Sequence, residues 1–301
     1  NSLIQNNFSG IYNSECTNIG TLYVTNTTIR DSLEGPGIYN ECGHVVLDRV
    51  TISGNYNYDN EGGGIRSIGK LDMTNVTIFG NGSDFSGGGI ALLAGSESYD
   101  DSIFTNVTIA NNEAPDNGGI YFQGFYSSVE MHNTLIANNS GDQCTRGLGD
   151  GVAISPFSTN NLATDDSCSE TPDNNFAETA DAKLATSLTD NGGEAPIGSG
   201  GLGGNVLTLA LLEGSPAIGS GDNEFCPVTD ERDGSRPFGT TCDIGAFEAR
   251  FASANPTTPG SAAAAGTLAN TGQNIALFAG LAVVIIGSGL AIGRVTLTKT
   301  Y

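Results

Sequence analysis

One short motif repeats along the chain, and this repetition limits the folds that the chain can adopt. Residues 74–81 read TNVTIFGN, and residues 105–112 return almost letter for letter as TNVTIANN. Looser copies, with successive copies spaced 23 to 31 residues apart, are centred on Ile4, Ile29, Ile52 and Ile136. A repeat of this short period is typical of a solenoid, in which each copy forms one coil of a stack.

Apolar and polar residues alternate within each copy, as they do in a short strand. Val76 and Ile78 are expected to point to one face, while Asn75 and Thr77 point to the other. Two further apolar runs complete each period, one before the motif and one at a Gly-Ile pair after it, such as Gly64-Ile65. Each period therefore predicts three short strands separated by turns rich in Gly, Asn and Asp.

An asparagine recurs three residues after the motif isoleucine. Its positions are Asn7, Asn55, Asn81, Asn112 and Asn139. Since stacked coils bring equivalent side chains together, we expect these amides to form an internal hydrogen-bonded ladder. A leucine-rich repeat would need regular Leu-x-x-Leu-x-Leu spacing, which is absent, and no long run has helical periodicity. The repeat region, 1–140, therefore predicts an all-β parallel β-helix. It begins inside a coil, so we expect a missing N-terminal segment and signal peptide.

The combined pattern of Gly-Gly-Ile, Asn-Val-Thr-Ile and the following Asn resembles the right-handed β-helix repeats of bacterial surface proteins. Those repeats share the pectin-lyase-like architecture. The resemblance implies a right-handed solenoid with three short strands per coil. It implies no particular activity, because such coils carry lyases, hydrolases, adhesins and inert stalks alike.

The region 141–250 is expected to add further coils and a disulfide-bridged C-terminal cap. It resembles the choice-of-anchor Q regions of surface proteins through Asn191-Gly192-Gly193, Ser215-Pro216-Ala217-Ile218, Asp230-Glu231-Arg232-Asp233, Arg236-Pro237 and Cys242-Asp243-Ile244-Gly245-Ala246-Phe247-Glu248. This resemblance implies a module that finishes the solenoid and precedes a surface anchor. We interpret the charged cluster of Arg232, Asp233, Arg236 and Asp243 as side chains that hold irregular backbone rather than as a site.

Six cysteines fall into three pairs that are local in sequence, and no CxxC or His-rich metal spacing occurs. Structural disulfides in an exported protein are the simplest explanation, with six reduced and buried thiols as the alternative. The predicted bridges are Cys16–Cys42, Cys144–Cys168 and Cys226–Cys242.

The C-terminal tail has the composition of an anchor. Residues 251–267 are uncharged and rich in Ala, Pro, Thr and Gly, as in a flexible linker. Residues 275–292 are uncharged and mostly apolar, long enough for one transmembrane helix. The tail after it, 293–301, carries Arg294 and Lys299, which predicts a cytoplasmic C-terminus and an extracellular body.

A pentapeptide precedes the apolar span, and it consists of Leu268, Ala269, Asn270, Thr271 and Gly272. The order of pentapeptide, span and basic end resembles a Gram-positive sortase signal, in the Leu-Ala-x-Thr-Gly variant of actinobacteria. The resemblance implies cleavage between Thr271 and Gly272 by a sortase partner, and attachment to the cell wall. The alternative is a plain membrane anchor with a chance pentapeptide.

The charge and the loop residues bear on function. The formal net charge is -22, and such acidity should repel nucleic acid and anionic membranes. We expect no catalytic residue and no metal site, because loop carboxylates such as Asp59 and Asp116 are scattered within the period. Calcium binding in the Asp-rich turns is a weaker expectation. The alternative is a polysaccharide lyase or glycoside hydrolase.

We therefore expect a non-enzymatic protein on the bacterial cell surface that serves adhesion, display or glycan binding. Its partner would be a glycan or the surface of a host or neighbouring cell. Aromatic residues in the loops are the candidate contacts, because exposed rings stack on sugars and partner surfaces. They are Tyr56, Tyr58, Phe85, Tyr99, Phe125 and Tyr126. The alternative is that these rings pack along the outside of the coils. The sequons at Asn26, Asn75 and Asn106 are interpreted as ladder residues rather than glycosylation sites.

Overall fold

A computed structural model describes residues 2–14, 20–93, 101–124, 128–147, 153–169, 176–192 and 206–251. All of them fall within one compact unit, Asn1–Ser253. The described residues form strands and turns and contain no helix. The expected linker, sorting motif and transmembrane span lie outside the described residues.

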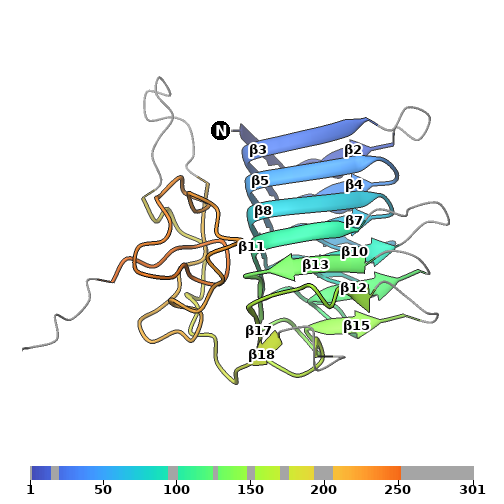
Figure 1. Ribbon diagram of the computed structural model, residues 1–301. Coiled ribbons are helices and arrows are strands. Elements are labelled where there is room, and N and C mark those ends of the chain that lie inside the picture. The colour runs from blue at the N-terminus through green and yellow to red at the C-terminus, as the bar shows by residue number, and fades with distance from the viewer. Residues whose placement is uncertain are drawn as a thin grey trace, which may run out of the picture. The chain divides into compact units, whose positions relative to one another are not determined.

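The strands form a parallel β-solenoid of about five turns (Figure 1). The long sheet has ten strands, which are β1 (Ser2–Gln5), β3 (Thr21–Arg30), β5 (His44–Ser53), β8 (Lys70–Phe79), β11 (Ser102–Ala110), β13 (Ser128–His132), β14 (Leu135–Ala137), β16 (Ala153–Ile154), β17 (Asn161–Ala163) and β18 (Phe176–Glu178). The short sheet has six, which are β2 (Ile11–Asn13), β4 (Ile38–Asn40), β7 (Ile65–Ser67), β10 (Ile90–Leu93), β12 (Ile120–Gln123) and β15 (Cys144–Arg146). In the turns between them, β6 (Tyr56–Asn57) pairs with β9 (Gly82–Ser83). The prediction of an all-β parallel solenoid is confirmed.

The repeat isoleucines stack coil on coil in the register that the sequence predicts. In the long sheet the column runs Ile4, Ile29, Ile52, Ile78, Ile109 and Ile136. In the short sheet it runs Ile11, Ile38, Ile65, Ile90 and Ile120. From the second coil to the fifth, these side chains have no exposed surface. A strand this short buries little alone, so its stability comes from the coils above and below.

Each long strand turns a corner at a residue with left-handed backbone conformation. The values of φ are 47° at Asn26, 54° at Arg49, 53° at Asn75 and 51° at Asn106. Asparagine tolerates this conformation better than most residues, which explains its place in the Thr-Asn-Val motif. Two of the three predicted strands of a coil are therefore continuous, as in β8. The alternation predicted Asn75 on a strand face beside Thr77, but Asn75 lies at the bend instead.

A hydrogen-bonded ladder runs through the turns that follow the long strands. Asn55 Nδ2 donates to Asn81 Oδ1 over 2.9 Å, Asn81 to Asn112 over 2.9 Å, and Asn112 to Asn139 over 2.9 Å. The same Nδ2 groups also donate to carbonyls of the previous coil, such as that of Ile52. The ladder ends at Gln143, which accepts from Asn139. Asn7, in the first coil, is exposed.

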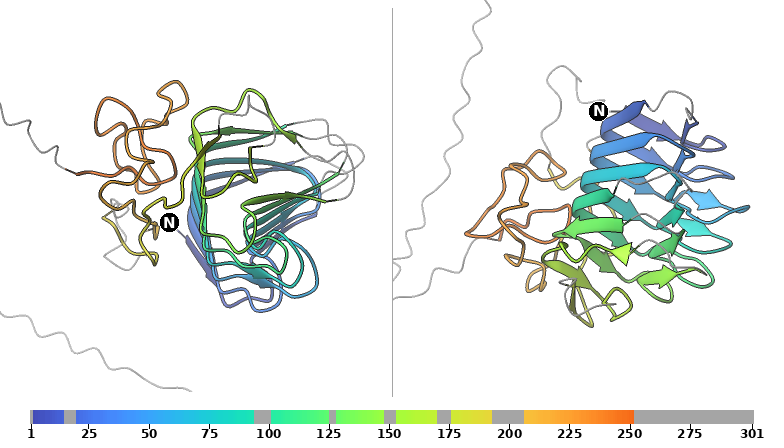
Figure 2. Two further views of the ribbon diagram at one scale, coloured as in Figure 1. Left: turned by 90° about the horizontal axis from the view of Figure 1, so that it is seen from below. Right: turned by 45° about the vertical axis from the view of Figure 1, so that its right-hand side comes forward.

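Most of the last described segment, residues 206–250, lies along the side of the stack, and we call these residues the strap. Figures 1 and 2 show it against the outer face of the long sheet. The strands β15 to β18 continue the stack as far as Glu178, so the strap follows the last coil in sequence but not in space. A second apolar cluster, separate from the solenoid interior, joins Leu135 and Leu162 to Leu209, Ile244 and Phe247 of the strap.

Candidate binding surface

The bend asparagines bind the backbone of the strap. Asn75 Nδ2 donates to the Thr229 carbonyl over 2.9 Å. Asn106 Nδ2 donates to the carbonyls of Asp243 and Gly245 over 2.9 and 3.0 Å. Both asparagines are buried. Contrary to the sequence-based interpretation, these sequon residues do not belong to the internal ladder. Their side-chain amides donate hydrogen bonds to carbonyls of the strap, where the backbone is irregular and lacks the regular pairing of a sheet.

The charged cluster of the strap binds backbone in the same way. Arg236 donates to the carbonyls of Asp243 and Gly245, and Arg232 donates to the carbonyls of Glu248 and Asn191. Asp243 accepts from the backbone amides of Gly219 and Ala249 over 2.7 and 2.6 Å. Asp233 is exposed and pairs with Arg49 over 3.2 Å. These contacts favour the interpretation that the cluster holds irregular backbone.

Glu231 is buried between two threonines of the long sheet. Thr51 Oγ1 lies 2.6 Å from the Leu207 carbonyl and 3.0 Å from Glu231 Oε1, and Thr77 Oγ1 contacts Glu231 Oε2. A carbonyl can only accept, so the single hydroxyl proton of Thr51 goes to Leu207. Both contacts of Thr51 are satisfied when a protonated Glu231 Oε1 donates to Thr51 Oγ1. Burial also raises the pKa of Glu231 well above its ordinary value. Burial and the contact with Thr51 therefore both favour the protonated carboxyl over the carboxylate.

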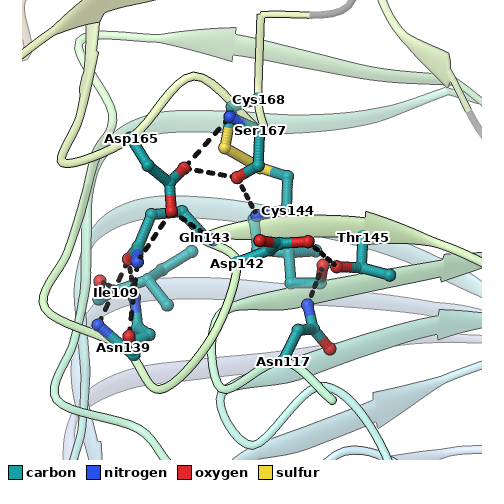
Figure 3. The surroundings of a disulfide bond; sticks show 11 residues. Ile109, Asn117, Asn139, Asp142, Gln143, Cys144, Thr145, Asp165, Ser167 and Cys168 are labelled. Atoms are coloured by element: carbon teal, nitrogen blue, oxygen red, sulfur yellow. Dashed lines mark hydrogen bonds between the residues drawn. A yellow bond between two sulfur atoms is a disulfide. The ribbon is translucent and has the colours of Figure 1, made fainter.

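Some of the described cysteines form disulfide bonds, and others are free thiols. Cys144 and Cys168 form a disulfide that ties β15 to a loop of the next coil, beside the hydrogen bonds of Ser167 and Asp165 (Figure 3). Cys42 is disulfide-bonded, and its expected partner Cys16 lies outside the described residues. Cys226 and Cys242 are separate thiols that donate to the carbonyls of Pro227 and Asp222, each over 3.7 Å, and burial raises the pKa of each thiol. Their predicted disulfide stays a prediction.

The turns between the long and the short sheet gather three of the predicted aromatic contacts. We call these turns the turn edge, and they comprise 6–10, 32–37, 54–64, 80–89, 111–119 and 138–143. The rings of Tyr56 and Tyr58 lie 4.5 Å apart, and Tyr56 donates to Asp84 over 2.7 Å. Tyr58 is 52% exposed and Phe85 is 48% exposed. The other expected contacts, Tyr99, Phe125 and Tyr126, lie outside the described residues.

Tyr56 differs from its two neighbours because its ring packs on the next coil. A Cβ added at Gly82 would lie 2.5 Å from a ring carbon of Tyr56, so only glycine permits this contact. The hydrogen bond to Asp84, together with desolvation, raises the pKa of Tyr56 to about 12. Tyr56 therefore supports the turn, while Tyr58 and Phe85 present apolar surface to solvent.

Two apolar side chains that sequence reasoning missed extend this surface. Phe8 is 66% exposed and Leu33 is 60% exposed. The backbone amides of Leu33 and Glu34 donate to the carbonyls of Asn7 and Phe8, which places the two turns side by side. The sequence did contain a signal for these two residues. Phe8, Leu33 and Tyr56 each come directly after the ladder position of their coil.

A second row of aromatic residues lies on the short sheet, and these residues contact side chains of neighbouring coils. The rings of Tyr12 and Tyr39 lie 4.9 Å apart, and the guanidinium of Arg66 lies 4.9 Å from the ring of Tyr39. Tyr12 also donates to Glu41 over 2.7 Å. Neighbouring coils use these groups to hold one another in register.

Within the described ranges, no three His, Cys, Asp or Glu side chains are grouped so that they could hold a metal ion. The same part of the chain has no helix of the length and apolarity that a membrane crossing requires. Comparisons with protein-family models, with curated proteins and with solved structures gave no match to this chain.

Proposed function

We propose that this chain is a non-enzymatic bacterial surface protein whose solenoid contacts a glycan or a protein of another cell through the turn edge. The observation that carries the proposal is the pair of exposed rings, Tyr58 and Phe85, on neighbouring turns of a regular stack. A regular stack holds the rings of successive coils at fixed spacing, and exposed aromatic side chains are favoured contacts in interfaces.

The proposed location rests on the sequence of the tail and on the cysteines. The sorting motif 268–272, the span 275–292 and the choice-of-anchor-like region 141–250 together favour a sortase-processed wall anchor. A disulfide at Cys144–Cys168 is consistent with an oxidising exterior. The proposal includes a right-handed solenoid of the pectin-lyase-like kind.

Mass spectrometry of the protein released from its own cell envelope tests the anchor. A C-terminus at Thr271 that carries a wall-peptide fragment is the expected result. An intact C-terminus at Tyr301 would instead mean a permanent membrane anchor and would move the proposed partners beneath the wall.

Adhesion of whole cells that display the full chain tests the contact surface. The double substitution Tyr58→Ser with Phe85→Ser should abolish adhesion and glycan-array binding above background. Phe157→Ser is the matched control, because Phe157 is 74% exposed but lies outside the turn edge. Equal adhesion of all three cell types would refute the contact surface. Turnover of a polyuronate by the purified protein would refute the non-enzymatic assignment and favour a lyase or hydrolase.

A further inference from the structure

The turn edge combines apolar surface with negative charge. It exposes Phe8, Leu33, Tyr58 and Phe85 on consecutive coils. It also carries seven carboxylates and no Lys, Arg or His. The carboxylates are Glu34, Asp59, Glu61, Asp84, Glu113, Asp116 and Asp142. An apolar ridge bordered by one sign of charge favours a partner with apolar or planar groups and the opposite charge.

Some of these carboxylates already have partners within the protein, and others are free to accept new ones. Asp84 accepts from Tyr56, and Glu61 lies 4.0 Å from Arg66. Glu34, Asp59 and Glu113 are exposed, and their carboxylates form no ion pair or hydrogen bond with any described residue. Three exposed acceptor groups without a cation therefore lie on the same edge as the exposed rings.

Arginine is the side chain that fits both features at once. Its guanidinium stacks on aromatic faces and also donates two parallel hydrogen bonds to a carboxylate. A glycan that bears carboxylates or sulfates would be repelled by this edge. A neutral glycan would bring no charge to pair with the three free carboxylates.

From this arrangement we infer that the turn edge binds an arginine-rich segment of a partner protein. The inference rests on the proposed function, since it names the chemistry of the partner at the same surface. The rings of Tyr58 and Phe85 provide the stacking surfaces. The carboxylates of Glu34, Asp59 and Glu113 provide the charge.

Binding of fluorescent nonapeptides to cells that display the full chain tests the inference. Nona-arginine should bind more tightly than nona-lysine, and a neutral Ser/Gly nonapeptide should not bind. The triple variant Glu34→Gln, Asp59→Asn, Glu113→Gln should weaken nona-arginine binding by about tenfold or more and flatten its salt dependence. Its control is Glu178→Gln, Glu213→Gln, Glu224→Gln, which removes the same charge from exposed sites elsewhere and should change binding by less than about twofold.

The outcomes separate this inference from the broader proposal. Equal weakening by both triple variants would reveal non-specific attraction to an acidic protein and overturn the inference. Cell adhesion that depends on Tyr58 and Phe85, combined with binding of a neutral glycan and no preference for arginine, would also overturn it while the proposed function stood. Loss of both kinds of binding would refute both.

Discussion

Two outward-facing regions of the same coils have opposite character. On the flank of the long sheet, polar side chains such as Thr51, Thr77 and Asn106 face outward, yet the strap buries them. On the turn edge, Tyr58 and Phe85 face outward and stay exposed. The usual association of polar with exposed and apolar with buried is inverted in both places. An outward position in a repeat therefore does not fix exposure, because a segment from elsewhere in the chain can cover it.

The flank is polar because of what covers it. The strap has little regular structure, so its carbonyls and amides need partners that a neighbouring strand would otherwise supply. A column of side-chain amides and hydroxyls on the sheet supplies them. The turn edge has no such cover among the described residues, and its rings are available to another molecule.

The largest effect is expected where the strap holds a buried charge. In Arg236→Ala, Glu248 loses the cation 3.7 Å away, and the carbonyls of Asp243 and Gly245 each lose one of the two side-chain donors that they accept from. Removal of one partner from a buried pair costs about 3–5 kcal/mol, so denaturant unfolding of the full chain should show a loss of this size. Arg30→Ala, at an exposed pair, is the control and should cost no more than about 1 kcal/mol. Similar losses in the two variants would mean that the strap adds little stability.

A smaller loss is expected at the bend asparagines. Asn106→Ala removes two hydrogen bonds to the strap and puts alanine at a φ of 51°, for a cost of about 2–4 kcal/mol. Asn106→Gly should recover about 1 kcal/mol of this, since glycine accepts positive φ. Asn138→Ala isolates the backbone term, because Asn138 has a φ of 57° but is exposed. If Asn138→Ala costs as much as Asn106→Ala in thermal unfolding, the strap contacts contribute nothing.

The protonated carboxyl on the flank should make stability depend on pH. The folded protein retains a proton on Glu231 above pH 4.5, the ordinary pKa, where the unfolded chain has released it. The free energy of unfolding should therefore fall as the pH rises through this range. Asp243, whose pKa burial raises to about 6, acts in the same direction.

Glu231→Gln tests this account, because the amide can donate to Thr51 and accept from Thr77 without titrating. Urea unfolding at a series of pH values should show a shallower decline for the variant than for the wild type. Thr145→Ser, at an outward position of the short sheet, is the control and should keep the wild-type slope. Identical slopes for Glu231→Gln and the wild type would show that Glu231 is ionised in the folded protein.

The smallest effect on stability is expected on the turn edge. Tyr58→Ser with Phe85→Ser should change the free energy of unfolding by less than about 0.5 kcal/mol per site, since both rings are half exposed. Circular dichroism melting curves would check this in the same samples that are tested for adhesion. A large loss of stability would mean that the rings support the stack, and would remove the contrast with the flank.

The repeat alone was enough to predict the stack and its register. The spacing of Ile29, Ile52, Ile78 and Ile109 predicts which residues pair, and the sheet pairs them so. The asparagines of the ladder could be found because each sits at one fixed offset from an isoleucine. The bends at Asn75 and Asn106 could not be identified from the pattern alone. The apolar positions shift by one residue there, as from Met73 to Val76, and such a shift fits a turn between two strands as well as a bend within one.

The parallel solenoid follows from the repeat, because short-range periodicity repeated many times leaves few ways to bury the apolar face. Which outward residues are covered depends instead on contacts between distant parts of the chain. The strap returns from residues 206–250 to contact Thr51, about 150 residues earlier in the chain. No local pattern encodes a contact between irregular backbone and a distant strand, since the strap lacks the period that made the coils predictable. For the same reason the protonated Glu231 and the exposed turn edge became visible only in three dimensions.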